Sequence, residues 1–160
     1  MFRVGLGSDI HPFDPKRPLV LGGVQISEKN GLSGHSDADV LVHALCDALL
    51  GAAALGDLGE HFPSTEKNKD RSSLEILQEV CQMVWTKGFS VTNADLTILL
   101  EEPKISPYKM AMREKMAMVM NIETTQVGLK ATTCEGLGFV GRGEGAFAQA
   151  VVLLKQRENR

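Results

Sequence analysis

Hydrophobic residues recur along this chain with two different periods, and each change of period marks the boundary between an expected strand and an expected helix. Alternating or short apolar runs predict strands over 2–9, 18–26, 90–100, 127–133 and 146–154, with the second bent at its glycine pair. Apolar spacings of three and four predict helices over 37–55 and 70–87, separated by a polar connection. A third helix is expected to begin with Ser106 as its N-cap and Pro107 at its first helical position.

The expected helix over 37–55 combines an apolar stripe with a polar edge. Ser36 or Asp37 is expected to supply its N-cap. Asp39, His43 and Asp47 are spaced four apart, so they share a face beside the stripe. The stripe itself consists of Val40, Leu41, Ala44, Leu45, Ala48 and Leu49.

Length and composition are those of one compact domain. The chain has 160 residues, of which 43% are hydrophobic and 23% charged, and it contains no repeat or linker, so a single domain over 1–160 mixing sheet and helices is expected. A formal charge of −3 without a basic run argues against nucleic-acid binding. The absence of a long apolar stretch or signal peptide, together with three widely spaced cysteines, favours a cytoplasmic protein with reduced thiols.

The histidines provide the first indication of chemistry. Asp9 and His11 lie two residues apart at the end of the first expected strand, so both side chains point to one face just past the strand end. His43 on the polar edge of the first helix can complete a three-ligand site of nitrogen and oxygen donors. Three such ligands leave one coordination position free, as in catalytic zinc sites. Asp39 and Asp47 are then expected to accept from the other ring nitrogen of His43. The alternative is a half-buried histidine without a metal.

A second cluster, KATTCEGLGFVGRGEG, runs from Lys130 to Gly145. Thr132 and Thr133 at a strand end can donate hydrogen bonds to phosphate oxygens, and Glu135 can hold a hard cation such as magnesium. Arg142 offers a guanidinium for a phosphate or carboxylate. Taken alone, this cluster is equally compatible with a solvated, glycine-rich hairpin.

Together, the segments GSDIHPF, GHSDADVLVHALCDALLGAAALGDLGEHFP, EEPKISP and KATTCEGLGFVGRGEG closely resemble the 2-C-methyl-D-erythritol 2,4-cyclodiphosphate synthase family of the non-mevalonate isoprenoid pathway. The resemblance covers essentially the whole chain. It implies an α+β fold, with a mixed sheet of about four strands and helices packed on one face. It also implies a homotrimer with the sheets toward the threefold axis and active sites between subunits.

The resemblance implies a role for each cluster in a single catalytic domain. Asp9, His11 and His43 would bind zinc or manganese, and Glu135 a magnesium or manganese ion that bridges the substrate diphosphate. His35 and Thr133 would stabilise the transition state. The substrate positions implied are Asp9, His11, His35, Ser36, Asp57, Leu58, Gly59, Phe62, Pro63, Ser64, Thr65, Glu66, Leu100, Glu101, Glu102, Pro103, Lys104, Ile105, Ser106, Thr132, Thr133, Cys134, Glu135, Phe139 and Arg142.

The implied substrate is a small cytidine diphosphate compound, 4-diphosphocytidyl-2-C-methyl-D-erythritol 2-phosphate, which would cyclise and release CMP. Residues 57–59 would hold its methylerythritol part, and residues 100–106 of the adjacent subunit its cytidine. Ser64 stands where the family commonly has an acidic residue, and its hydroxyl can still hydrogen-bond a sugar-like hydroxyl. Two other functions use the same residues: a metal-dependent phosphohydrolase that activates water, and a non-catalytic trimer that binds a phosphorylated isoprenoid.

Overall fold

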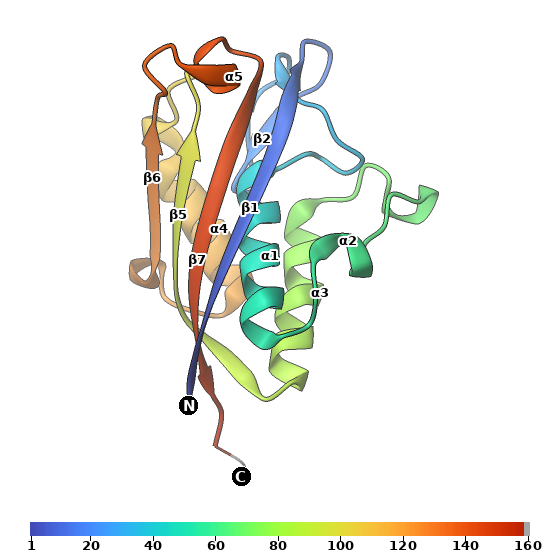
Figure 1. Ribbon diagram of the computed structural model, residues 1–160, viewed down its shortest axis with the longest axis vertical. Helices are drawn as coiled ribbons and strands as arrows, with labels where there is room; N and C mark the ends of the chain where they lie inside the picture. Colours follow the sequence, from blue (N-terminus) through green and yellow to red (C-terminus); the bar gives the residue numbers. More distant parts are fainter. Residues whose placement is uncertain (159–160) are drawn as a thin grey trace.

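The computed structural model describes residues 1–158 as an α+β domain in which one sheet is covered by helices (Figure 1). The strands are β1 (Phe2–Asp14), β2 (Leu19–Leu21), β3 (Val24–Ser27), β4 (Gly31–Leu32), β5 (Phe89–Leu99), β6 (Val127–Thr132) and β7 (Gly145–Gln156). The helices are α1 (Val40–Ala53), α2 (Leu58–His61), α3 (Ser73–Thr86), α4 (Lys109–Met120) and α5 (Gly138–Gly141), and short 3₁₀ turns are η1 (Glu66–Asn68), η2 (Ser106–Tyr108) and η3 (Thr124–Gln126). Within residues 1–158, no helix is long and apolar enough to cross a membrane.

Four long strands form the sheet, as expected, with the two-residue β4 added at one edge. The order is β4-β1-β7-β5-β6, in which β5 and β6 are parallel and the other pairs are antiparallel. The sheet is therefore mixed. A separate hairpin of β2 and β3 turns at Gly22 and Gly23, which confirms the predicted bend.

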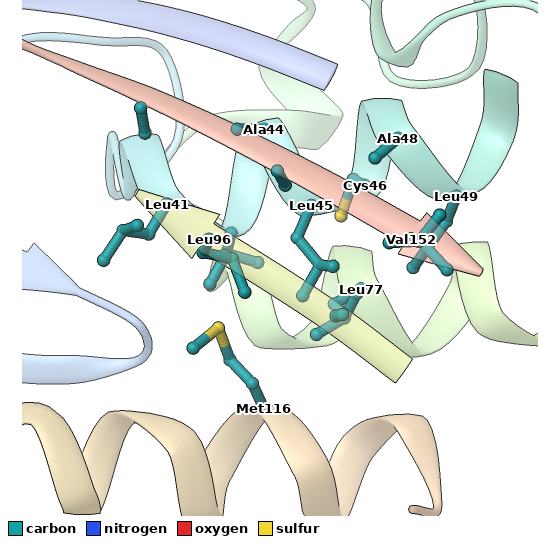
Figure 2. Close-up of a cluster of buried hydrophobic side chains, with 14 of the residues drawn as sticks. Leu41, Ala44, Leu45, Cys46, Ala48, Leu49, Leu77, Leu96, Met116 and Val152 are labelled. Carbon is teal, nitrogen blue, oxygen red and sulfur yellow. The ribbon is translucent and has the colours of Figure 1, made fainter. Parts of the chain in front are cut away.

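The core lies between the sheet and its helices. Figure 2 shows Leu45 of α1 among Leu96 of β5, Val152 of β7, Leu77 of α3 and Met116 of α4. All five side chains are almost completely buried, so α1 forms the centre of the domain with sheet on one side and helices on the other. Cys46 belongs to this core, in agreement with its predicted role as a filler.

The alternation of residues along β1 separates two environments. Gly5 and Gly7 face α1 so closely that a methyl group on either would lie about 2 Å from a backbone oxygen of the helix. Since side chains alternate along a strand, Asp9 and His11 share this helix-facing side. The residues at even positions point the other way, and four of them are large, apolar and exposed: Phe2, Val4, Leu6 and Ile10.

Three predicted boundaries were wrong. β1 continues to Asp14, so Asp9 and His11 lie within the strand and not just past its end. The N-cap of α1 is Asp39, whose carboxylate accepts the N–H of Val42, and not Ser36 or Asp37. Residues 106–108 form the 3₁₀ turn η2 with Ile105 at its cap, and α4 begins only at Lys109.

Candidate active site

Asp9, His11 and His43 converge on one point between β1 and α1. The Oδ2 atom of Asp9 lies 2.8 Å from Nε2 of His11 and 3.1 Å from Nδ1 of His43, and the two ring nitrogens are 3.1 Å apart. In a tetrahedral zinc site with bonds of about 2.0–2.1 Å, neighbouring ligand atoms lie about 3.3 Å apart. The three residues are therefore close enough to bind one metal ion.

The outer nitrogen of His11 supports this interpretation. Nδ1 of His11 lies 2.7 Å from the carbonyl oxygen of Ser33 and must donate to it, because a carbonyl only accepts. A neutral His11 then directs the lone pair of Nε2 toward Asp9 and His43. When Nδ1 of His43 is also unprotonated, three electron-rich atoms face one another and repel, and a cation relieves that repulsion. The donor set of one carboxylate and two imidazoles suits a divalent transition metal.

Asp9 and His11 shift each other's pKa. Burial alone would raise the pKa of Asp9, but the hydrogen bonds and positive charge of His11 and His43 outweigh burial and lower this pKa to about 2. Burial would lower the pKa of His11, but its hydrogen bond to the Asp9 carboxylate, together with that negative charge, raises it. Without a metal, a proton therefore binds between Asp9 and His11 more tightly than to a free histidine.

The expected partners of the other ring nitrogen of His43 were wrong. Nε2 of His43 lies 3.0 Å from the hydroxyls of both Ser36 and Ser73, and not beside Asp39 or Asp47. The fully buried Asp39 instead accepts backbone N–H groups of Gly22, Gly23 and Val42. Asp47 accepts the N–H of Leu58 and so attaches the start of α2 to α1.

Ser73 is a neighbour of the triad that sequence reasoning missed. It follows His43 by 30 residues and lies on α3, and its only sequence signal is its place near the start of a predicted helix. No spacing rule joins it to His43, since the contact depends on how α3 packs against α1.

Two cavities adjoin the triad. A cavity of about 160 Å³ is lined by predicted site residues and by two others: His11, His35, Ser36, His43, Leu58, Phe62, Ser64, Asn68 and Ile76. A second cavity of about 310 Å³ is lined by Ser8, Asp9, His43, Asp47, Asp57, Leu58 and Gly59. The structure thus brings the predicted metal ligands, residues 57–59 and Ser64 to one region. The carbonyl of Thr65 accepts a hydrogen bond from Nε2 of His35. The neighbouring residues Pro63 and Glu66 are exposed to solvent.

Thr132 is the last residue of β6, and Thr133 to Glu135 lead into a turn beyond it. The hydroxyl of Thr133 lies 3.2 Å from Oε1 of Glu135, and Glu135 has a left-handed backbone with φ of 52°. The carboxylate of Glu101 accepts the backbone N–H of Cys134 at 2.7 Å. Glu101 therefore fixes the turn to the segment that follows β5. The alternative of a glycine-rich hairpin was wrong, because residues 138–141 form the short helix α5.

Five of the other predicted site residues border a different cavity of about 790 Å³. Its walls include Glu101, Glu102, Pro103, Lys104 and Arg142. Leu100 and Ile105 are buried, Ser106 is exposed and Phe139 is half-buried. Arg142 pairs with Glu144, which raises the pKa of the guanidinium and lowers that of the carboxyl.

Comparisons with known proteins agree with this architecture. The chain matches the YgbB family over residues 2–155. It is 56% identical to the 2-C-methyl-D-erythritol 2,4-cyclodiphosphate synthase of Moorella thermoacetica, over 98% of this chain and 96% of the relative. The enzyme of the same name from Prosthecochloris aestuarii is 51% identical, over 97% of this chain and 99% of the relative.

Solved structures show the same fold. The bifunctional IspDF of Campylobacter jejuni superposes with a TM-score of 0.95 at 42% identity, covering 99% of this chain, which spans 43% of that longer protein. The CDP complex of IspF from Plasmodium falciparum superposes with a TM-score of 0.86 at 31% identity, covering 98% of this chain and 97% of that one.

The fold and the Asp-His-His cluster define an α+β domain with a candidate transition-metal centre. The YgbB match and the full-length relatives identify it more closely, and they confirm the resemblance seen in the sequence motifs. The chain belongs to the 2-C-methyl-D-erythritol 2,4-cyclodiphosphate synthase family.

Proposed function

We propose that this protein is the enzyme that converts 4-diphosphocytidyl-2-C-methyl-D-erythritol 2-phosphate to 2-C-methyl-D-erythritol 2,4-cyclodiphosphate and CMP. In this reaction the 2-phosphate attacks the β-phosphorus and CMP leaves. The observation that carries the proposal is the convergence of Asp9, His11 and His43 beside two cavities, in a chain that matches family members along their full length.

The chemistry requires positioning and charge neutralisation, and no general base, because the attacking phosphate is already ionised near neutral pH. Asp9, His11 and His43 would hold zinc or manganese, and Glu135 would hold magnesium or manganese. When bound, such ions supply polarisation of phosphate oxygens and neutralisation of their charge. The remaining contributions come from the side chains of the chain itself.

His35 and Thr133 are the proposed donors to the charge that develops on the transferred phosphoryl group. Each can offer an N–H or O–H that strengthens as negative charge grows, which is the requirement for transition-state stabilisation. Ser36 and residues 57–59 would orient the methylerythritol phosphate, since they border the cavities beside the triad. Leu100 to Ser106 would bind the cytidine, as the proposed family role implies.

We further propose that each active site lies between two subunits of a trimer. The triad lies on β1 and α1, whereas Thr133 and Glu135 follow β6. β7 and β5 separate β1 from β6, so the two clusters stand three strand spacings apart, about 14 Å within one chain. The triad of one subunit and Thr133 and Glu135 of another are therefore the groups that would contact a single diphosphate.

The uncovered face of the sheet supports self-association. Val4 and Leu6 of β1 are 68% and 63% exposed, and Val151 of β7, paired with Leu6, is 44% exposed. A contiguous apolar surface of this kind is typical of a protein interface. A trimer with these faces inward would bury it. The cytoplasm remains the proposed location, supported by three cysteines without disulfide partners.

Phosphorus NMR of the purified protein with substrate, magnesium and zinc tests the reaction. The expected result is a pair of cyclic-diphosphate resonances together with an equal amount of CMP. CMP with a linear product would show a phosphohydrolase instead. An unchanged substrate spectrum with metal bound would show a binding protein without this activity.

Mixing two inactive variants tests the shared site. His43→Ala lacks the triad and Thr133→Ala lacks the turn donor, so neither homotrimer should turn over at the normal rate. After joint unfolding and reassembly, every mixed trimer has one junction with an intact triad facing an intact turn, and about a quarter of wild-type activity is expected. Activity no higher than that of the separate variants would place each site within one chain.

A further inference from the structure

On the side of His43 away from Asp9, the hydrogen-bond donors and acceptors can be assigned from the chemistry of the groups. Nε2 of His43 lies 3.0 Å from the Ser73 hydroxyl, which in turn contacts a carboxylate oxygen of Asp37. The other oxygen of Asp37 lies 2.8 Å from the backbone nitrogen of Ser73. Asp37, Ser73 and His43 thus form a chain that ends at the candidate metal centre.

The chemistry of the three groups fixes where the protons lie. A carboxylate only accepts, so the hydroxyl proton of Ser73 points toward Asp37. The Ser73 oxygen is left with lone pairs facing Nε2 of His43, so that nitrogen must carry the ring proton. A neutral His43 then has its lone pair on Nδ1, which faces Asp9 at 3.1 Å.

Ser36 does not enforce this arrangement by itself. Its hydroxyl also lies 3.0 Å from Nε2 of His43, and it accepts the N–H of Ala38 at 3.3 Å. Among residues 1–158 no carboxylate accepts the Ser36 proton, so that hydroxyl can hydrogen-bond to either tautomer of the ring. Ser73 is fully buried at the start of α3, and its proton is already committed to Asp37.

We infer that Asp37 and Ser73 are positioning residues that hold His43 in the tautomer that binds metal. Asp37 orients the hydroxyl of Ser73, and Ser73 orients the imidazole proton of His43. The inference rests on the metal site of the proposed function and not on the cyclisation reaction. It assigns a role to two residues that lie outside the triad and on a different helix or loop.

The test uses two measurements on Ser73→Ala that do not depend on turnover. Nitrogen NMR of the metal-free protein reports the His43 tautomer, and competition with a chromogenic chelator reports zinc affinity. We expect wild type to be protonated at Nε2, and the variant to lose that preference and to bind zinc about 10–100-fold more weakly. Ser72→Ala is the matched control, because Ser72 is the adjacent residue and its side chain makes no capping hydrogen bond.

Asp37→Ala is the second variant, and it tests whether Asp37 acts on His43 through Ser73. It keeps the Ser73 hydroxyl but frees its proton to donate to His43, so a mixture of tautomers and weaker zinc binding are expected. Because Asp37 acts through Ser73, adding Asp37→Ala to Ser73→Ala should weaken zinc binding no further. Losses that multiply in the double variant would assign Asp37 a separate structural effect and overturn the relay.

An unchanged His43 tautomer and an unchanged zinc affinity in Ser73→Ala would overturn the inference outright. If Ser73→Ala does not fold, the tautomer in Asp37→Ala decides, and retention of the wild-type tautomer there overturns it. Failure of the cyclisation assay would affect the proposed function alone, since these readouts concern only metal binding and ring protonation.

Discussion

Gly7 lies against the carbonyl oxygen of Ala44, so that a methyl group on Gly7 would be 2.1 Å from that oxygen. Gly7→Ala should therefore push α1 away from β1 and destabilise the fold by about 1–3 kcal/mol. The same displacement would move His43 from Asp9 and weaken metal binding. Urea unfolding and chelator competition measure the two effects.

Gly51, which lies on α1, is the matched control for Gly7→Ala. It is exposed, and a methyl group there would meet nothing within 4 Å. Gly51→Ala should leave metal affinity unchanged and stabilise the protein by up to about 1 kcal/mol, because alanine favours helix. Equal effects of the two substitutions would contradict the close-packing explanation.

His43→Ala should abolish stoichiometric zinc binding and turnover while the fold is kept. The triad loses one of three ligands, and His43 lies at the edge of the core rather than in its centre. Metal analysis after dialysis and circular dichroism measure the two outcomes. His61→Ala is the control, since His61 is an exposed histidine whose Nε2 lies beside the carbonyl of Leu55 and away from the triad. A His43→Ala protein that retains zinc and full activity would refute the site.

Thr133→Ala should lower kcat by about 10²–10³, by analogy with the loss of one oxyanion-hole donor. KM should change much less, because the proposed interaction strengthens only as charge develops in the transition state. Thr133→Ser keeps the hydroxyl and should restore most of the rate. A loss confined to KM would show that Thr133 only binds the ground state.

The metal-free protein should show a stability maximum attributable to Asp9. Its folded-state pKa of about 2 lies below the reference value of 3.8, so the unfolded chain binds more protons between these pH values and stability rises with pH there. His11 has a folded-state pKa above 6.5, so its contribution is present below pH 6.5 and is lost as the pH rises through the folded value.

Asp9→Asn removes both effects. The difference in unfolding free energy between wild type and Asp9→Asn, measured in chelator, should reach about 2 kcal/mol between roughly pH 4 and 6.5 and decline on either side. A difference that stays constant from acid to alkaline pH would show that the Asp9–His11 charge pair does not contribute to stability.

Local patterns were sufficient to predict that Asp9, His11 and His43 come together. Asp9 and His11 share a side of any strand, and His43 lies on the polar edge of a clearly amphipathic helix. The end of β1 could not be read locally, because Pro12 is a poor strand residue. Pairing of His11 with Ala146 and of Pro12 with Gly145 extends the strand all the same.

Contacts between distant segments account for the remaining errors. Ser36, Asp37 and Asp39 are all suitable N-caps, and the choice falls on Asp39 because its carboxylate also binds Gly22 and Gly23 of the hairpin turn. Ser73 reaches His43 only because α3 packs against α1. No periodicity in the sequence contains that information.

The alternation along β1 limits where this chain can gain or lose a residue. The exposed apolar residues from Phe2 to Ile10 and the helix-facing residues Asp9 and His11 occupy opposite sides of one strand. Insertion or deletion of a single residue before Asp9 would exchange the two sides from that point on. It would turn the carboxylate and the imidazole outward and drive an isoleucine toward the helix. The number of residues between Gly5, Gly7, Asp9 and His11 is therefore fixed by the two-residue repeat of the strand, because all four must face the helix.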